Sequence, residues 1–388
     1  LAPVFETEMR RTTRLLRLPE GGAAELALDQ GEIRAGGQAA PLIEAELELI
    51  EGTPATLFTI ARTLFERTPV RFSRHSKAAR GGRLAAGLPA IEPPAVRRAR
   101  VVSLDPKGGP AAALRALLLE CLEQIAANAE LIAVSPAPEG PHQLRVGLRR
   151  LRAVLRIAKA AGVSIPTLDA AAREFGQAAS ALRDLDAVRT DLLGPARAAR
   201  PDDAGLAAIA AALEAAAGPA RTTLRARLAA GDFQRFLLDL AEAAATLDVP
   251  AVPGLRKTAR RALDKAHRKV LAHGPDVAAL DVPARHELRK ALKRLRSSVS
   301  FLGPLFDPVA TKAYLKRARS MQRTLGARND LATAEALFTG GTLPALDCPD
   351  TAFAAGRLTG ALEVEADRVW AGAGPAWAAL AEGDPFWR

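Results

Sequence analysis

The sequence contains few aromatic residues and few cysteines. Aromatic side chains make up 4% of the chain and include one tyrosine, so a protein that stacks single-stranded nucleic acid on aromatic rings is poorly supported. The two cysteines, Cys121 and Cys348, lie far apart and form no CxxC pattern. This usage favours a reducing, cytoplasmic location over a disulfide framework.

Long apolar runs are also missing. No stretch reaches the roughly 18 apolar residues that a membrane-spanning helix needs, and the opening LAPVFETEMRR lacks the apolar segment of a signal peptide. The sequence therefore predicts neither export nor a membrane partner. Because the chain begins with Leu1 and not with methionine, we expect an N-terminal portion of the protein to precede it.

Acidic residues are outnumbered by basic ones. The 388 residues include 54 Lys and Arg against 43 Asp and Glu, which gives a formal net charge of +11. This balance indicates an anionic partner. The chain length favours two domains, and a hydrophobic content of 49% is sufficient for buried cores.

A basic helical pattern occurs twice, as HQLRVGLRRLRAVLR at 142–156 and as HELRKALKRLRSSVS at 286–300. At about 100° per residue, each copy places leucines on one helix face and cations on the opposite face. The leucine faces contain Leu144, Leu148, Leu151 and Leu155 in the first copy and Leu288, Leu292, Leu295 and Val299 in the second. The cationic faces contain His142, Arg145, Arg149, Arg152 and Arg156 in the first copy and His286, Arg289, Lys293 and Arg296 in the second.

These cationic faces favour a polyanionic partner. Like charges on one helix face repel by about 0.2–0.5 kcal/mol per pair, and neither face contains a carboxylate. A bound polyanion would neutralise this repulsion. The alternative is a solvated basic face. The two histidines lack the i,i+4 partners of a metal site and are interpreted as anion donors, with packing at a helix start as the alternative.

Further basic residues extend the candidate anion site. Lys312, Lys316, Arg319 and Arg323 form a third stripe, and Arg256 and Arg260 align on an earlier helix. Arg150, Lys290 and Arg294 adjoin the repeated faces, whereas Lys257, Arg261 and Arg268 spread around their helix and include residues that we expect to be solvated. Asp184 and Asp330 lie at equivalent positions after the two histidine helices. Each either orients an arginine of the basic stripe or bonds backbone at a helix junction.

The first part of the chain predicts strands. Residues 25–33 alternate, with a turn expected at Gln30–Gly31, and in 43–52 the alternation places Glu44, Glu46 and Glu48 on one strand face. Such a face is either solvated or holds a divalent metal. We expect a helix at 54–69 that ends before Pro69, and a short basic loop or strand at 75–84.

The rest of the chain predicts helices. A linker rich in Pro and Gly is expected at 93–108, between an N-terminal domain at 1–92 and a helical domain at 109–388 with internal repeats at about 109–246 and 252–388. The expected helices are 111–133, 141–161, 167–193, 203–229, 232–246, 253–273, 283–303, 309–338 and 350–383, the last interrupted near Gly372–Pro375.

The segments 3–11, 25–33, 43–49 and 76–81 resemble, in this order, the C-terminal half of a CYTH domain, the triphosphate tunnel family. The resemblance implies an antiparallel β-tunnel that hydrolyses triphosphate with Mg²⁺ or Mn²⁺. Arg11, Lys77 and Arg80 would then face the phosphates, and Glu46 and Glu48 would bind the metal. The family's opening ExExK strand does not occur in the sequence, so hydrolysis is expected only if the native protein supplies it.

The region after the linker resembles a CHAD domain, the conserved-histidine α-helical domain. The resemblance rests on the repeated HxxRxxx(R/K)xxR motif and on the trailing segments 182-LRDLD-186 and 328-RNDLA-332. It implies two pseudo-symmetric helical bundles with a basic channel between them and binding of inorganic polyphosphate, which needs no cofactor. A CYTH domain followed by a CHAD domain is a known pairing.

The expected fold is therefore mainly α, with two pseudo-repeated helical bundles and a small antiparallel β-tunnel-like α+β domain at the N-terminus. The expected function is polyphosphate binding by a cytoplasmic protein that associates with polyphosphate granules. Two alternatives stay open. In the first, metal-dependent triphosphate hydrolysis is the main role and the helical domain recruits the substrate. In the second, the basic faces bind nucleic acid.

Overall fold

The structure is a computed structural model, and it describes the chain except for residues 1–2, 68–69, 251–253, 341–342 and 344–347. Two expectations lie outside the described residues. These are the end of the first helix at Pro69 and the start of the second repeat at residue 252.

The N-terminal part is a three-stranded antiparallel sheet of β1 (Glu6–Arg17), β2 (Ala23–Ala35) and β3 (Gln38–Glu51), in the order β1-β2-β3. The turn expected at Gln30–Gly31 is wrong, because both residues lie inside β2 and pair with β1. The chain reverses instead at Gly36 and Gly37, whose φ angles of 55° and 78° suit residues without a Cβ.

This sheet is open in the part of the chain that the structure describes. β1 and β3 are its edges, so these strands do not close into the expected tunnel. The loop or strand expected at 75–84 is also wrong, because Lys77–Ala85 forms helix α2. The Ser76 hydroxyl accepts a hydrogen bond from the Ala79 N–H (3.2 Å) and caps the helix.

The helical region begins after the linker, and its predicted helices are confirmed to within a few residues. The predicted first repeat contains α3 (Pro110–Val134), α4 (Glu139–Ala160), α5 (Pro166–Ala178), α6 (Ser180–Ala187), the π-helical η1 (Val188–Leu193), α7 (Gly194–Ala199), α8 (Ala204–Ala229) and α9 (Gly231–Thr246). The predicted second repeat contains α10 (Leu255–Leu271), α11 (Val282–Leu302), the 3₁₀ turn η2 (Gly303–Leu305), α12 (Pro308–Thr339), α13 (Pro349–Trp370) and α14 (Ala373–Ala381). The expected helix at 167–193 is divided into α5, α6 and η1.

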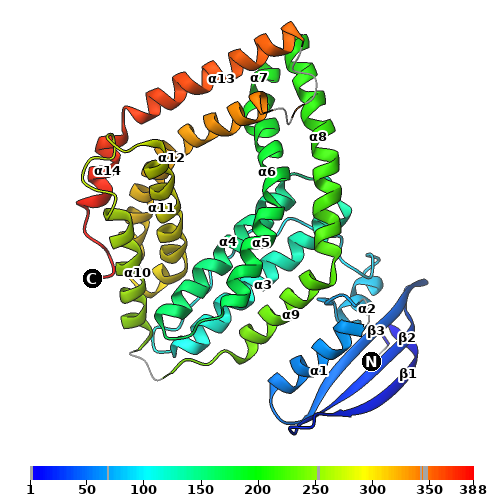
Figure 1. Cartoon of the computed structure of the whole chain (residues 1–388). Helices are drawn as coiled ribbons and strands as arrows, with labels where there is room; N and C mark the ends of the chain where they lie inside the picture. The colour runs from blue at the N-terminus through cyan, green and yellow to red at the C-terminus, as the bar shows by residue number, and fades with distance from the viewer. Residues whose placement is uncertain (1–2, 68–69, 251–253, 341–342, 344–347) are drawn as a thin grey trace.

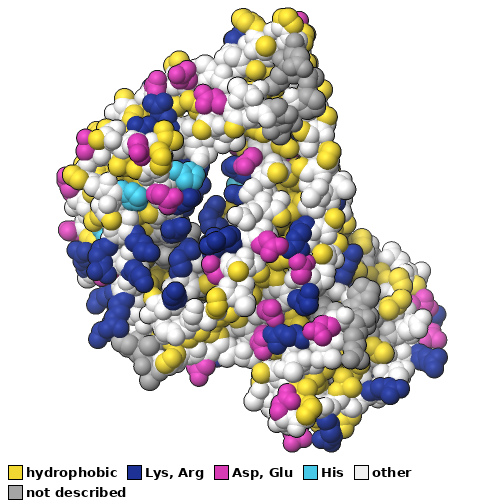
Figure 2. Space-filling model, viewed as in Figure 1, with side chains coloured by type: hydrophobic (Ala, Val, Ile, Leu, Met, Phe, Trp, Pro, Cys, Tyr) yellow, Lys and Arg dark blue, Asp and Glu magenta, His cyan; other side chains and the backbone are white. Residues whose placement is uncertain are grey.

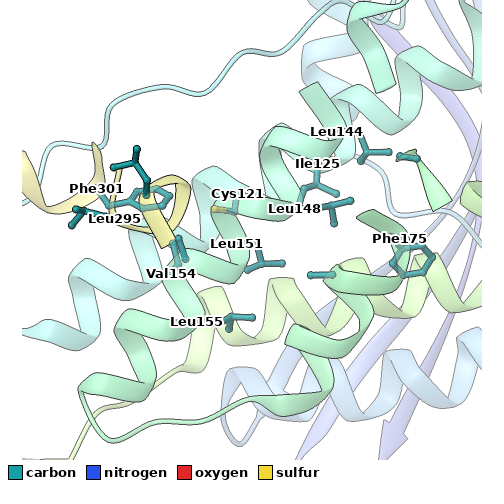
Figure 3. Close-up of a cluster of buried hydrophobic side chains, with 14 of the residues drawn as sticks. Cys121, Ile125, Leu144, Leu148, Leu151, Val154, Leu155, Phe175, Leu295 and Phe301 are labelled. Atoms are coloured by element: carbon teal, nitrogen blue, oxygen red, sulfur yellow. The ribbon is translucent and has the colours of Figure 1, made fainter. Parts of the chain in front are cut away.

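The leucine faces of α4 and α11 form the centres of the two bundles. Leu144, Leu148 and Leu151 of α4 are at most 1% exposed and pack with residues of α3 and α5, including Ile125 and Phe175 (Figure 3). Leu288, Leu292, Leu295 and Val299 of α11 are equally buried. Burial of each such side chain contributes about 1.5–3 kcal/mol. The cationic faces are therefore directed away from the cores.

The helices follow a ring (Figure 1). α4 packs against α10 and α11 on one side, and α13 packs against α8 on the other. At the second contact Arg357 pairs with Asp203 (3.2 Å). The sheet joins the ring through α1 (Pro54–Arg67), which packs on α9, where Arg62 pairs with Asp239 (2.9 Å). Within the described residues, no helix combines the length and the apolar character that crossing a membrane requires.

Candidate anion-binding site

The space-filling view shows an opening through the ring, and Lys and Arg side chains gather beside it (Figure 2). α4 and α11 are in contact at this position, and their leucine faces are buried in the two bundles. The fold therefore brings the two predicted cationic faces together from opposite repeats.

Arg149 and Lys293 have the same charged surroundings. Burial and, to a smaller extent, the charges of Arg145, Arg296, Arg183 and Arg289 together lower the pKa of Arg149 to about 10. Burial and, to a smaller extent, the charges of Arg289, Arg149, Arg183 and Arg145 likewise lower the pKa of Lys293 to about 7. Arg149 is nevertheless accessible to solvent. We call Arg145, Arg149, Arg183, Arg289, Lys293 and Arg296 the central cluster.

Neutral groups orient three arginines of the central cluster. Arg145 donates to the Gly176 carbonyl (2.9 Å) and to the Ser180 hydroxyl, Arg289 donates to the Asn329 side-chain oxygen (2.7 Å), and Arg296 donates to the Gln322 side-chain oxygen. These bonds fix the guanidinium groups without cancelling their charge. Because burial raises the repulsion between like charges, the free site favours an anionic ligand.

Carboxylates compensate the central cluster only in part. In the part of the chain that the structure describes, Asp184 accepts a hydrogen bond from its neighbour Arg183 at 2.9 Å, and not from an arginine of the predicted stripes. The pKa of Asp330 is raised by burial, although the charges of Arg289, Arg183 and Lys293 act in the opposite direction. Within the described residues, Arg183 is the one member of the central cluster that forms an ion pair.

Four predicted anion-binding residues have partners of their own. Arg152 pairs with Asp169 (2.8 Å), Lys290 pairs with Glu287 (2.8 Å), Arg256 donates to the Leu305 carbonyl (2.9 Å), and Arg150 is 8% exposed and lies over the Phe301 ring at 4.2 Å. Arg150 thus contributes to the contact between α4 and α11. Carboxylates therefore balance the charges of Arg152 and Lys290.

The other predicted residues lie around the central cluster or on the surface. The pKa of Arg156 is lowered to about 10 by burial and by the charges of Arg294 and Arg152, and Arg319 acts on Arg296 in the same way. The side chains of Arg260, Lys312, Lys316 and Arg323 are exposed. His142 and His286 are also accessible to solvent, although neighbouring groups partly desolvate their rings, and this desolvation is the main cause that lowers their pKa values.

Sequence reasoning missed Arg183. It lies on α6, and its charge affects Arg149, Lys293 and Arg289. The sequence signal that could have identified it is the segment 182-LRDLD-186, but the prediction named only Asp184 from this segment. α6 places the arginine beside α4 and α11, a position that local periodicity does not reveal.

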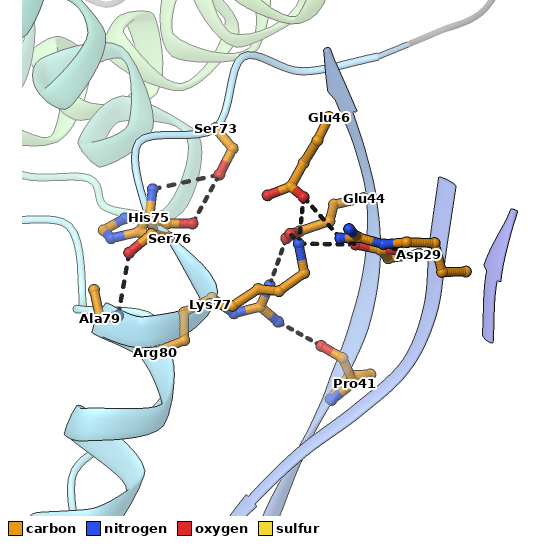
Figure 4. A network of polar contacts seen from close by, with 11 residues as sticks. Asp29, Pro41, Glu44, Glu46, Ser73, His75, Ser76, Lys77, Ala79 and Arg80 are labelled. Atoms are coloured by element: carbon orange, nitrogen blue, oxygen red, sulfur yellow. Dashed lines mark hydrogen bonds and ion pairs between the residues drawn. The ribbon is translucent and has the colours of Figure 1, made fainter. Parts of the chain in front are cut away.

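The N-terminal sheet contains a second charged group (Figure 4). The Lys77 ammonium contacts the carboxylates of Asp29 (2.8 Å), Glu46 (2.8 Å) and Glu44. Arg11 pairs with Asp29 (2.7 Å) and Glu46 (3.0 Å) and, through its hydrogen bond, lowers the pKa of Asp29 to about 2. Arg80 pairs with Glu44 (3.2 Å) and donates to the Pro41 carbonyl (2.6 Å). The predicted phosphate-facing residues therefore come together with carboxylates.

The carboxylates of this group suit a divalent cation. Oxygen atoms of Asp29, Glu44 and Glu46 lie within 4.8 Å of one another, and hard cations such as Mg²⁺ prefer carboxylate oxygens. Lys77 contacts all three carboxylates, so a metal ion would replace its ammonium group. Of the two predicted metal ligands, Glu46 belongs to this group and Glu48 does not.

Comparison with known proteins identifies similar sequences and folds. Residues 116–339, more than half of the chain, match the family described as the CHAD domain. The CHAD domain from the plant Ricinus communis has a similar structure, with a TM-score of 0.63 and 28% identity over 75% of this chain and 98% of that chain. PptA from Streptomyces chartreusis shares the fold, with a TM-score of 0.52 and 17% identity over 70% of this chain and 99% of that chain.

A curated relative matches a shorter stretch. An inorganic triphosphatase of Haemophilus influenzae is 43% identical over 82 residues, or 21% of this chain. The chain spans 23% of the length of that relative.

Proposed function

The chain belongs to the CHAD domain family, and on this basis we propose that it binds inorganic polyphosphate at the opening through the ring, beside α4 and α11. The central cluster carries this proposal, because six cations from both repeats converge there and one of them has a carboxylate partner. A linear polyphosphate presents closely spaced negative charges and no bases. Its chemistry therefore matches a site that is rich in guanidinium groups and poor in aromatic rings.

Arginine and lysine have different roles in this proposal. A guanidinium group forms forked hydrogen bonds to phosphate oxygens, whereas the Lys293 ammonium provides a compact charge. Neutral partners already orient Arg145, Arg289 and Arg296, so little side-chain order is lost on binding. Each neutralised phosphate releases counterions, and the affinity is expected to fall steeply as salt is added.

The test is polyphosphate affinity at two salt concentrations for the wild type and for a variant with Arg289→Ala, Lys293→Ala and Arg296→Ala. Loss of three phosphate contacts is expected to weaken binding by about 100-fold or more at low salt. A variant with Lys107→Ala, Arg200→Ala and Arg235→Ala removes the same charge from exposed positions and is expected to bind normally. Unchanged binding by the first variant, with its fold retained in circular dichroism, would contradict the proposal.

Nucleic acid is the competing polyanion. It shares the phosphate charge, but the chain is poor in the aromatic side chains on which bases stack, at 4% of its residues. Polyphosphate is therefore expected to displace bound DNA at a far lower phosphate concentration than DNA needs to displace polyphosphate. The reverse order in a competition experiment would favour a nucleic-acid-binding protein.

A second candidate function is metal-dependent hydrolysis of triphosphate in the N-terminal part. It is supported by the 82-residue match to an inorganic triphosphatase and by the carboxylates of Asp29, Glu44 and Glu46. These carboxylates would hold Mg²⁺ or Mn²⁺, and a bound metal would screen the charge of the phosphates. Once released from the carboxylates, Arg11, Lys77 and Arg80 would bind phosphate oxygens.

Triphosphate hydrolysis in the presence of Mn²⁺ tests this candidate. Glu46→Gln is expected to abolish activity, and Glu48→Gln shows whether the neighbouring carboxylate also contributes. Chelation of divalent metal is expected to stop hydrolysis and to leave polyphosphate binding intact. Full activity of the Glu46→Gln variant would remove this residue from the metal site.

Binding to long polyphosphate would also place the protein at polyphosphate granules in the cytoplasm. Fluorescence microscopy of the wild type and of the Arg289, Lys293 and Arg296 triple variant tests this location. An identical distribution of the two proteins would contradict it.

A further inference from the structure

The outer face of α10 forms a second cationic surface. The helix has 17 residues and contains Arg256, Lys257, Arg260, Arg261, Lys265, Arg268 and Lys269, all of them exposed. Within the described residues, none of these seven side chains forms an ion pair. Asp264 is the one acid on this helix, and its carboxylate accepts a hydrogen bond from the Trp387 indole (2.9 Å) and pairs with Arg388 (3.6 Å).

The fold itself does not require this charge. α3 occupies the equivalent position in the first repeat, since it precedes and packs against α4 as α10 precedes and packs against α11. α3 contains one cation, Arg115, and three acids, whereas α10 contains seven cations and one acid. Two helices with the same place in the repeats therefore differ in the charge of their outer faces.

The spacing on α10 increases the repulsion between its charges. Lys257, Arg261, Lys265 and Lys269 follow one another at intervals of four residues, so each lies one turn from the next. An ordinary solvated helix would intersperse acids in such a row. The row is therefore better matched to an anionic ligand than to water alone.

This surface is continuous with the opening. In Figure 2 the Lys and Arg side chains extend from the opening across α11 to the outer edge of the ring at α10. Arg156 on α4 and Arg294 on α11 lie close enough for the charge of one to lower the pKa of the other. A chain that leaves the central cluster in this direction would thus meet cations along its path.

We propose that the outer face of α10 is a second polyanion subsite, which holds the part of a long polyphosphate chain that extends beyond the opening. The inference rests on the proposed function and adds a preference for chain length. A 17-residue helix is about 25 Å long, so the subsite extends the site by up to about this distance. Short chains contact the central cluster alone, whereas long chains contact both.

The experiment compares long-chain polyphosphate with triphosphate. A variant with Lys257→Gln, Arg261→Gln and Lys265→Gln removes three cations of the α10 row, and glutamine preserves helix propensity. Its affinity for the long chain is expected to fall about tenfold at low salt, and the slope of log affinity against log salt is expected to decrease by about two. Its affinity for triphosphate is expected to stay within twofold of the wild type.

The matched control carries Lys107→Gln, Arg200→Gln and Arg235→Gln, which remove the same charge elsewhere on the surface. If the α10 variant and this control bind the long chain equally well, the subsite is refuted, and an equal loss of affinity for triphosphate refutes the length preference. If the wild type fails to bind long-chain polyphosphate at all, the proposed function itself is wrong. Circular dichroism and thermal midpoints confirm that the compared proteins are folded.

Discussion

Polyphosphate binding should be accompanied by proton uptake, because Lys293 lies among cations in the free protein. Burial and the charges of Arg289, Arg149, Arg183 and Arg145 lower the pKa of its ammonium to about 7. At pH 8 the free side chain is therefore mostly neutral. A bound phosphate supplies the missing negative charge and returns the pKa towards the ordinary value of 10.5.

The magnitude follows from these two pKa values. At pH 8 a group with a pKa of about 7 has lost about 0.9 proton, which binding is expected to restore. The difference between 10.5 and about 7 corresponds to at most about 5 kcal/mol, and solvent at the opening reduces this amount. Above pH 7, affinity is expected to fall by up to about tenfold per pH unit.

The same group affects stability with a definite sign. Its pKa is lower in the folded protein than in the unfolded chain, so between about pH 7 and 10.5 the unfolded chain binds more protons. The charged Lys293 side chain therefore lowers the free energy of unfolding by its full amount below pH 7. This unfavourable contribution disappears as the pH rises from about 7 to 10.5. Lys293→Met is expected to raise the thermal midpoint at pH 6 more than at pH 10.

Isothermal titration calorimetry in two buffers with different ionisation enthalpies measures the proton uptake. Lys293→Met should abolish the uptake assigned to this side chain, and Lys293→Arg should retain binding with a weaker pH dependence, because arginine stays charged. Protons that polyphosphate itself exchanges are common to all three proteins. Equal uptake by the wild type and the Met variant would refute the assignment to Lys293.

Three further predictions concern stability and shape. Trp387 is fully buried, and Trp387→Ala is expected to lower the free energy of unfolding by about 3–5 kcal/mol in urea denaturation; a loss below 1 kcal/mol would contradict its place in the core. The guanidinium of Arg97 lies 2.7 Å from the Glu120 carboxylate, and Glu120→Ala leaves it largely buried without this partner. The free energy of unfolding is expected to fall by about 3 kcal/mol in the same assay. A Cβ on Gly205 would lie 2.4 Å from the Asp350 carbonyl oxygen, so Gly205→Leu should separate α8 from α13 and increase the radius of gyration in small-angle X-ray scattering; an unchanged radius would contradict this contact.

The local features of the site were predictable from the sequence because they depend on helical periodicity. A leucine face and a cationic face recur in 142–156 and 286–300, and burial of the leucines confirms which face is directed inward. Which cations meet across the ring depends on contacts between distant segments. The proximity of Arg149 to Lys293, and the contribution of Arg183, follow from the packing of α4, α6 and α11, which no local pattern contains.

The two wrong local predictions have identifiable physical causes. Gln30–Gly31 resembles a turn, but pairing on both sides of β2 extends the strand through these residues, and the chain turns at Gly36 and Gly37 instead. The segment after His75 contains two adjacent glycines, which usually weaken a helix. At Gly81 an added Cβ would lie 2.3 Å from the Phe5 ring, so tertiary packing requires the glycine that local propensity disfavours.

The two charged groups of this protein differ in how their charge is balanced. In the N-terminal sheet, Arg11, Lys77 and Arg80 face three carboxylates, so a phosphate must compete with Asp29, Glu44 and Glu46 unless a metal takes these carboxylates. At the opening, the central cluster is held mainly by neutral groups, and an anion gains its attraction without displacing existing ion pairs. The proposed polyphosphate binding at the opening would therefore need no metal, whereas phosphate binding in the sheet would need a cation that occupies the carboxylates.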